Sequence, residues 1–157
     1  MGTPATVALR RAGIDFEVRT YPHDAADEAY GVEAARALGV PESRVFKTLL
    51  ADTDRGLVVA VVPVSDRLDL KALAAAAGAK KASMADPAAA ERSSGYVVGG
   101  ISPVGQRTPR PTVLDLAART FTSILVSGGR RGLDLELRPD DLARVTGATW
   151  ATVTRRR

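Results

Sequence analysis

The sequence predicts an α/β (α+β) protein, with a mixed sheet or partial barrel surrounded by helices. Strand and helix patterns are interleaved along the chain without the regular strand-helix-strand repeat of a doubly wound sheet. A hairpin has a second arm that is continuously apolar and is expected to be buried on both faces. Since 157 residues with 45% hydrophobic content suffice for one sizeable core, we expect residues 1–157 to form a single domain.

The N-terminal part carries a helix, a strand and a second helix. A first helix is expected from Pro4 to Gly13, because proline suits the first helical turn and glycine ends a helix. A strand follows over 16–21 and is broken by a Pro-His-Asp turn. A short helix is predicted over 33–38, with Gly39 as its terminator.

The middle of the chain reads as a hairpin. Its arms are expected over 45–50 and 57–64, joined by the turn composition of residues 52–56. The second arm has no polar residue between Leu57 and Val62, which predicts burial on both faces.

Shorter elements complete the prediction. Helices are expected over 69–77, from Asp86-Pro87 to Gly95 and over 140–146, and strands over 112–114, 123–127, 133–137 and 149–153. The alanine run 72–77 predicts a helix packed closely against the sheet.

One lysine stands inside the apolar first arm of the hairpin. Alternation along a strand places Lys47 in a row with Val45 and Leu49, and Phe46 and Thr48 on the other face. An ammonium in such a row must reach solvent along its aliphatic stem, find an anionic partner or serve a ligand. Lys47 is therefore the first candidate for a functional residue.

Composition excludes several classes of chemistry. The chain has no cysteine and one histidine, His23, and its acidic residues show no metal-ligand spacing, so we expect neither a metal nor a cofactor. The net charge of +4 favours polyanions only mildly. No apolar run approaches the roughly 20 residues of a membrane span, and no secretory signal opens the chain, so a cytoplasmic protein without membrane contact is expected.

Two glycine-rich segments could position a substrate. Backbone amides in the bend 99–103 can approach a carbonyl oxygen closely and stabilise a developing oxyanion. The segment 127–134 combines flexible backbone with arginines and a carboxylate, which could hold a sugar or an amine. Plain connecting turns remain the alternative for both segments.

Several longer motifs occur together and in order. They are Thr3-Pro4-Ala5, Tyr21 to Asp24, Phe46-Lys47-Thr48-Leu49-Leu50, Lys80-Lys81 with Met84-Ala85-Asp86, Gly95 to Pro103, and Val126 to Gly129 with Gly132-Leu133-Asp134. Over nearly the whole chain this set resembles the YbaK/EbsC family, the Cys-tRNA(Pro) deacylases related to the editing domain of bacterial prolyl-tRNA synthetase.

The resemblance implies a trans-editing enzyme that clears cysteine mischarged onto proline tRNA, with that tRNA's acceptor end and prolyl-tRNA synthetase as partners. It implies that Lys47 places the tRNA ribose and that Gly100 lies at the centre of the carbonyl site. The other substrate-binding positions that it implies are Tyr21, Tyr30, Thr48, Gly99, Ser102, Pro103, Ser127 and Asp134.

In this family the substrate's own thiol is thought to attack its ester carbonyl and to leave as a cyclic thiolactone. That route would account for a chain without an evident nucleophile. Two alternatives stay open: a deacylase for another mischarged amino acid, alanine or serine, and a noncatalytic module that binds tRNA or its aminoacyl group.

Overall fold

The computed structural model describes residues 2–24 and 29–156. Its strands are β1 (Glu17–Thr20), β2 (Phe46–Thr53), β3 (Gly56–Pro63), β4 (Asp66–Leu68), β5 (Ala82–Met84), β6 (Thr112–Asp115), β7 (Ile124–Arg130), β8 (Leu133–Leu137), β9 (Thr149–Ala151) and β10 (Thr154–Arg156). Its helices are α1 (Pro4–Arg11), α2 (Tyr30–Leu38), α3 (Leu70–Ala76), α4 (Pro87–Ser94) and α5 (Pro139–Thr146), with 3₁₀ turns at Glu42–Arg44 and Leu116–Thr120.

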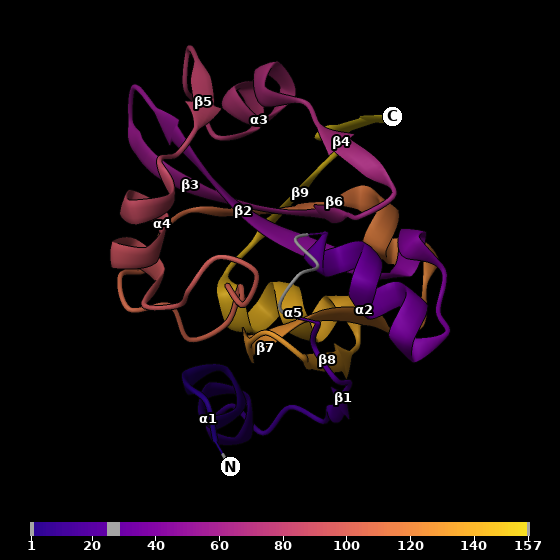
Figure 1. Ribbon diagram of the computed structural model, residues 1–157. Helices are drawn as coiled ribbons and strands as arrows, with labels where there is room; N and C mark the ends of the chain where they lie inside the picture. Colours follow the sequence, from indigo (N-terminus) through magenta and orange to yellow (C-terminus); the bar gives the residue numbers. More distant parts are fainter. Residues whose placement is uncertain (1, 25–28, 157) are drawn as a thin grey trace.

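Two sheets form the centre of the molecule (Figure 1). The larger has the order β5-β2-β3-β6-β9; its pairs with β2 are antiparallel, whereas β3-β6 and β6-β9 are parallel. The smaller is antiparallel, in the order β1-β8-β7. A parallel bridge between Val45 and Leu125 joins the two, so the predicted mixed sheet that closes partly on itself is confirmed.

The central hairpin forms as predicted and is longer than expected. Phe46 pairs with Pro63 at one end and Thr53 with Gly56 at the other, so β2 continues three residues beyond Leu50. From Val58 onward every residue of β3 is buried, which confirms the prediction from its apolar run. The turn is fixed by the Thr53 hydroxyl, which donates to the Gly56 carbonyl at 2.6 Å.

The helices begin and end at local signals. In α1, Thr3 accepts from the Thr6 amide while the Thr6 hydroxyl accepts from the Thr3 amide, a reciprocal cap that satisfies two otherwise free donors. Helix α2 begins at Tyr30, three residues before the predicted start, and ends as predicted at Gly39 in a left-handed conformation. The earlier start matters because it places Tyr30 on a helix.

Two hydrophobic clusters lie on opposite faces of the larger sheet. The main core lies between the two sheets and includes Phe46 and Leu50 of β2, with Val126 and Leu135 of the smaller sheet. On the other face, Leu73 of α3 packs against side chains of β2, β3 and β6, so the predicted alanine-rich helix covers this face. The sheet is therefore buried on both sides of β3.

Three strands of three residues each were not predicted from the sequence. They are β4, β5 and β10. Strand β10 pairs with β4, so the arginine-rich end of the chain is an exposed strand. Within residues 2–24 and 29–156, no helix has the length and apolarity needed to cross a membrane.

Candidate active site

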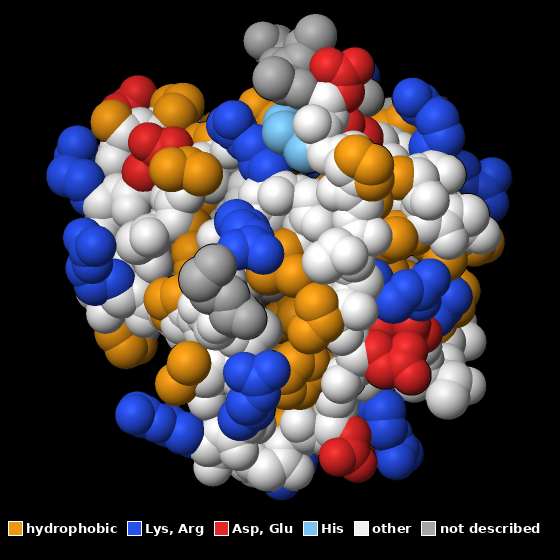
Figure 2. Space-filling view, turned by 60° about the horizontal axis from the view of Figure 1, so that its bottom comes forward, with side chains coloured by type: hydrophobic (Ala, Val, Ile, Leu, Met, Phe, Trp, Pro, Cys, Tyr) orange, Lys and Arg blue, Asp and Glu red, His pale blue; other side chains and the backbone are white. Residues whose placement is uncertain are grey.

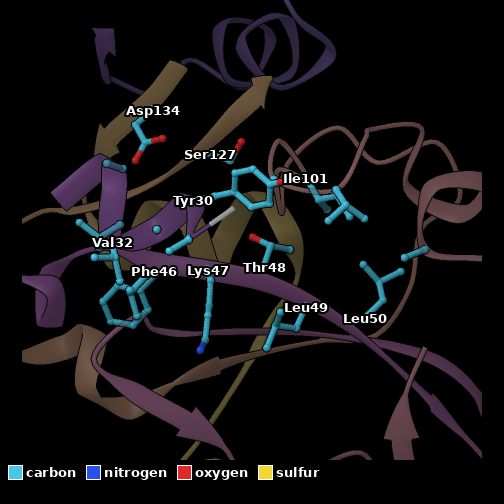
Figure 3. Close-up of a pocket in the computed structure, with 18 of the residues that line it drawn as sticks. Tyr30, Val32, Phe46, Lys47, Thr48, Leu49, Leu50, Ile101, Ser127 and Asp134 are labelled. Carbon is cyan, nitrogen blue, oxygen red and sulfur yellow. The ribbon is translucent and has the colours of Figure 1, made fainter. Parts of the chain in front are cut away.

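A cavity of about 420 Å³ opens beside β2. It lies between α2, the segment 98–101 and the smaller sheet, and Figure 3 shows its labelled side chains. The lining is mostly apolar, with side chains such as Val32, Leu50 and Ile101. The predicted site residues that line it are Tyr21, Tyr30, Lys47, Thr48, Gly99, Ser127 and Asp134.

The wall of this cavity is the open edge of a strand. Strand β3 pairs with β2 along its whole length, whereas β5 pairs only with residues 51–53, so residues 46–50 have an edge without a neighbour in the larger sheet. Val64 donates to the Val45 carbonyl on the β3 side, and Ala85 donates to the Leu50 carbonyl on the other side. Because backbone groups alternate between the two edges of a strand, the amide and carbonyl of Thr48 point to the open edge.

Thr48 and Lys47 point to opposite faces of β2, as alternation predicted. In Figure 3 the Thr48 side chain points toward Tyr30 and Ser127, whereas Lys47 extends to the other side of the strand. There its ammonium donates to the carbonyl of Asp66 at 3.1 Å. The Thr48 hydroxyl is buried in the cavity and has no hydrogen-bond partner among the described residues.

Asp134 supplies a buried carboxylate to the cavity. It lies on β8 directly opposite Ser127 of β7, so the two side chains share one face of the smaller sheet. The residue is 6% exposed, and burial raises the pKa of its carboxyl to about 7. No hydrogen bond or ion pair joins this carboxylate to the described part of the chain, whereas the Ser127 hydroxyl accepts from the Gly129 amide at 3.2 Å.

The glycine-rich loop is held by its flanks. The Val98 amide donates to Glu91 of α4 at 2.8 Å, and the buried Tyr96 hydroxyl donates to the Val104 carbonyl at 2.6 Å. Within the loop, the Gly100 amide donates to the Val97 carbonyl at 2.8 Å. Turn formation therefore occupies the amide that was expected to stabilise an oxyanion.

Three predicted site residues in this loop do not line the cavity. Gly100, Ser102 and Pro103 are buried in the packing behind it, and the Ser102 hydroxyl accepts from the Val104 amide at 3.2 Å. Gly99 and Ile101 line the cavity instead. The loop therefore contacts the cavity through Val98, Gly99 and Ile101, while the turn places Gly100 against the packing behind it.

The rim of the cavity contains an arginine of the 127–134 segment that was not among the predicted site residues. The guanidinium carbon of Arg131 lies 4.8 Å from the ring centroid of Tyr30. Nearby, His23 contacts Glu33 at 2.6 Å and ties the segment before α2 to that helix. This contact joins two residues about 100 positions apart in the sequence. The place of Arg131 in the 127–134 segment was the only sequence feature that indicated a role for it.

The fold and the cavity define an α/β protein with an apolar pocket that contains a few polar groups, a composition typical of small-ligand sites. Among the described residues, no group of three or more His, Asp or Glu side chains is arranged to hold a metal ion. The chain belongs to the aminoacyl-tRNA editing domain family, whose model matches residues 25–145.

Sequence comparison with a known protein supports the assignment to this family. The chain is 39% identical over 129 residues to the "Putative Cys-tRNA(Pro)/Cys-tRNA(Cys) deacylase EbsC" of Enterococcus faecalis (strain ATCC 700802 / V583), covering 82% of this chain and 79% of that protein. The resemblance to YbaK/EbsC proteins read from the sequence is thereby confirmed.

Two crystal structures are similar throughout. One, described as "a putative trans-editing enzyme for prolyl tRNA synthetase", gives a TM-score of 0.86 at 26% identity, with 99% of each chain covered. The other, "hypothetical protein APE2540", gives a TM-score of 0.88 at 27% identity, covering 98% of this chain and 100% of that one.

Proposed function

We propose that this protein is a trans-editing deacylase that hydrolyses the ester of cysteine mischarged onto proline tRNA. The observation that carries the proposal is an apolar cavity lined by the buried Thr48 hydroxyl and the buried Asp134 carboxylate, neither of which is hydrogen-bonded to the described part of the chain. Membership of the editing family and the name of the EbsC relative support the same activity.

The polar groups of the cavity match the groups of an aminoacyl ester. When ionised, Asp134 accepts hydrogen bonds from the α-ammonium of the amino acid. The Thr48 hydroxyl and the Thr48 amide at the open edge of β2 are donors for the ester carbonyl as it becomes an oxyanion. They replace Gly100 in that role, because the Gly100 amide is engaged with Val97.

Ser127 is the serine that lines the cavity among the described residues, and no hydrogen bond joins its hydroxyl to the Asp134 carboxylate opposite it. Ser127 bonds a backbone amide, and the only histidine contacts Glu33. The substrate therefore supplies the nucleophile: its thiol forms a bond to the ester carbon, the bond from that carbon to the ribose oxygen breaks, and the thiol proton passes to that oxygen. The products are a free tRNA end and a thiolactone, which water then opens to cysteine. An intramolecular thiol held near its target has an effective molarity on the order of 10⁵ M or more.

Lys47 lies on the side of β2 away from the aminoacyl groups, which suits a contact with the RNA. We expect Lys47→Met to keep the aliphatic stem and the fold, to raise KM for cysteinyl-tRNA by about tenfold, and to reduce the salt dependence of binding by about one unit of slope. Lys71→Met, at an exposed site on α3, is the matched control. Unchanged KM and salt slope in Lys47→Met would exclude the RNA contact.

A substrate panel tests the proposed reaction. Cysteinyl-, alanyl-, seryl- and S-methylcysteinyl-tRNA(Pro) are compared, with and without prolyl-tRNA synthetase. We expect rapid loss of cysteine with thiolactone as first product, and resistance of the S-methyl ester, which fills similar space but lacks the thiol. The synthetase should lower KM if it delivers the tRNA.

Other outcomes of the panel identify the alternatives. Preferred cleavage of the alanyl or seryl ester would show a deacylase of other specificity, for which water is the nucleophile. Binding without cleavage of any ester would show a noncatalytic module. Cleavage of the S-methyl ester at the cysteinyl rate would exclude the thiol-assisted route.

A further inference from the structure

Arg131 connects three segments at the rim of the cavity. It lies in the turn between β7 and β8, and its Nε and Nη2 atoms donate to the Val98 carbonyl at 3.0 and 2.6 Å. Its guanidinium carbon is 4.8 Å from the centroid of the Tyr30 ring, at the first residue of α2. The plane of the guanidinium is therefore fixed by two hydrogen bonds and one ring.

The glycine between these groups shows how closely they pack. A Cβ at Gly99 would lie 2.8 Å from Arg131 Nε and 2.9 Å from carbons of the Tyr30 ring. Gly99 also has a φ of +89°, which other residues rarely adopt. Both Gly99 and Tyr30 line the cavity, so Arg131 lies at its entrance.

Arg131 itself is exposed to solvent and forms no ion pair with a carboxylate among the described residues. An ordered arginine on a surface loses rotamer freedom, which opposes folding. Here one edge of the guanidinium binds a carbonyl and one contact is to an aromatic ring, so its remaining surface is presented to solvent in a fixed orientation. Planar guanidinium groups of this kind stack on nucleic-acid bases.

We propose that Arg131 binds the 3′-terminal adenine of the tRNA, which stacks on the exposed surface of its guanidinium. The inference rests on the proposed function, because an aminoacyl group in the cavity holds its ribose at the entrance. In a nucleotide the base is attached to C1′ and the 5′-phosphate is carried through C4′, so the two groups leave the ribose from different ring carbons. Arg131 then contacts the base, while Lys47, on the other side of β2, lies toward the sugar-phosphate backbone of the tRNA.

Binding of a stable analogue tests the contact without requiring catalysis. The probe is 3′-deoxy-3′-(cysteinylamino)adenosine, in which an amide replaces the ester, and its counterpart without the base is the comparison. Affinities are measured by calorimetry for the wild type, Arg131→Gln, Arg131→Lys and the control Arg130→Gln, an exposed arginine one position away at the end of β7. Melting temperatures show that each variant is folded.

We expect Arg131→Gln and Arg131→Lys to weaken binding of the adenosine probe by about 5- to 100-fold, since base stacking has that magnitude. The probe without the base should bind all proteins alike, and Arg130→Gln should match the wild type. Equal weakening of both probes would overturn the proposal, because Arg131 would then only support the cavity. Full affinity in Arg131→Lys would also overturn it, because charge alone would suffice.

The proposed reaction and the adenine contact fail separately. If the wild type does not deacylate cysteinyl-tRNA but Arg131→Gln loses affinity for the adenosine probe alone, the reaction is wrong and the contact stands. If the wild type deacylates and the Arg131 variants keep wild-type affinity and KM, the reaction stands and the contact is excluded.

Discussion

At Thr48 a side-chain oxygen is buried in the cavity with no partner among the described residues. An unpaired buried hydroxyl costs about 1–3 kcal/mol, which a methyl of similar size avoids. We therefore expect Thr48→Val to unfold at the same or a higher temperature than the wild type while kcat/KM for cysteinyl-tRNA falls about 10- to 100-fold. Thermal unfolding and deacylation of one preparation measure both.

Thr53→Val is the matched control, on the same strand. The Thr53 hydroxyl donates to Gly56 and accepts from the Arg55 amide, so its loss should lower stability and leave activity per folded molecule intact. Normal activity in Thr48→Val, or a loss of stability equal to that in Thr53→Val, would show that the Thr48 hydroxyl serves the fold.

The pKa of Asp134 predicts how the stability of the protein depends on pH. Its pKa is raised from 3.8 to about 7 by burial, so the folded state holds this proton more tightly than the unfolded state. With respect to this group, the free energy of unfolding is highest below about pH 4. It falls progressively as the pH rises to about 7 and does not change further above that. We expect Asp134→Asn to be more stable than the wild type at pH 8, by at most about 4 kcal/mol, and to lose this advantage near pH 4.

Urea unfolding of both proteins across pH 4–8 measures this difference. Deacylation by Asp134→Asn should fall below the wild-type rate as the pH rises through about 7, because the wild-type carboxyl then ionises and pairs with the α-ammonium whereas the amide stays neutral. A stability difference that does not vary with pH would mean that Asp134 keeps its ordinary pKa in the folded protein.

At the scale of elements, the glycine loop packs directly on the β7–β8 hairpin. A Cβ at Gly100 would lie 2.7 Å from the Cα and 2.9 Å from the carbonyl carbon of Arg130, both backbone atoms that cannot rotate away. We expect Gly100→Ala to cost about 1–3 kcal/mol of stability and to reduce activity by moving loop and hairpin apart. Unfolding and activity per folded molecule are measured together.

This prediction differs from the one that the sequence suggested. If the Gly100 amide faced the ester carbonyl of the substrate, Gly100→Ala would reduce activity and leave the stability of the protein unchanged. If Gly100→Ala melts like the wild type but is inactive, the backbone packing is not the reason for this glycine.

At the scale of the whole molecule, the two hydrophobic clusters separate stability from activity. Leu73 of α3 is fully buried in the cluster on the face of the larger sheet away from the smaller one. Leu73→Ala should cost about 2–5 kcal/mol of stability and leave activity per folded molecule unchanged well below its melting temperature. A fall in kcat at full folding would mean that α3 influences the cavity through the sheet.

The charge of the molecule suits a contact with only the end of the tRNA. On the face in Figure 2, Lys and Arg side chains are spread around a band of hydrophobic side chains and form no single continuous cluster. A net charge of +4 favours only limited electrostatic affinity for RNA, so delivery by a partner is consistent with the proposed trans-editing role.

The sequence by itself determined the elements whose signals are local. The β2–β3 hairpin, the burial of β3, the capped α1, the end of α2 at Gly39 and the opposite orientation of Lys47 and Thr48 all follow from turn residues, caps and alternation. Its long motifs in order also identified the family.

Only the tertiary structure decided which groups are available to a substrate. Strands β4, β5 and β10 are too short to carry a pattern and exist because partners pair with them. Whether the Gly100 amide is free depends on a turn, and the placement of Arg131 on Tyr30 depends on two segments that meet in space. Availability of a polar group is a property of its surroundings, and for these residues the surroundings come from distant parts of the chain.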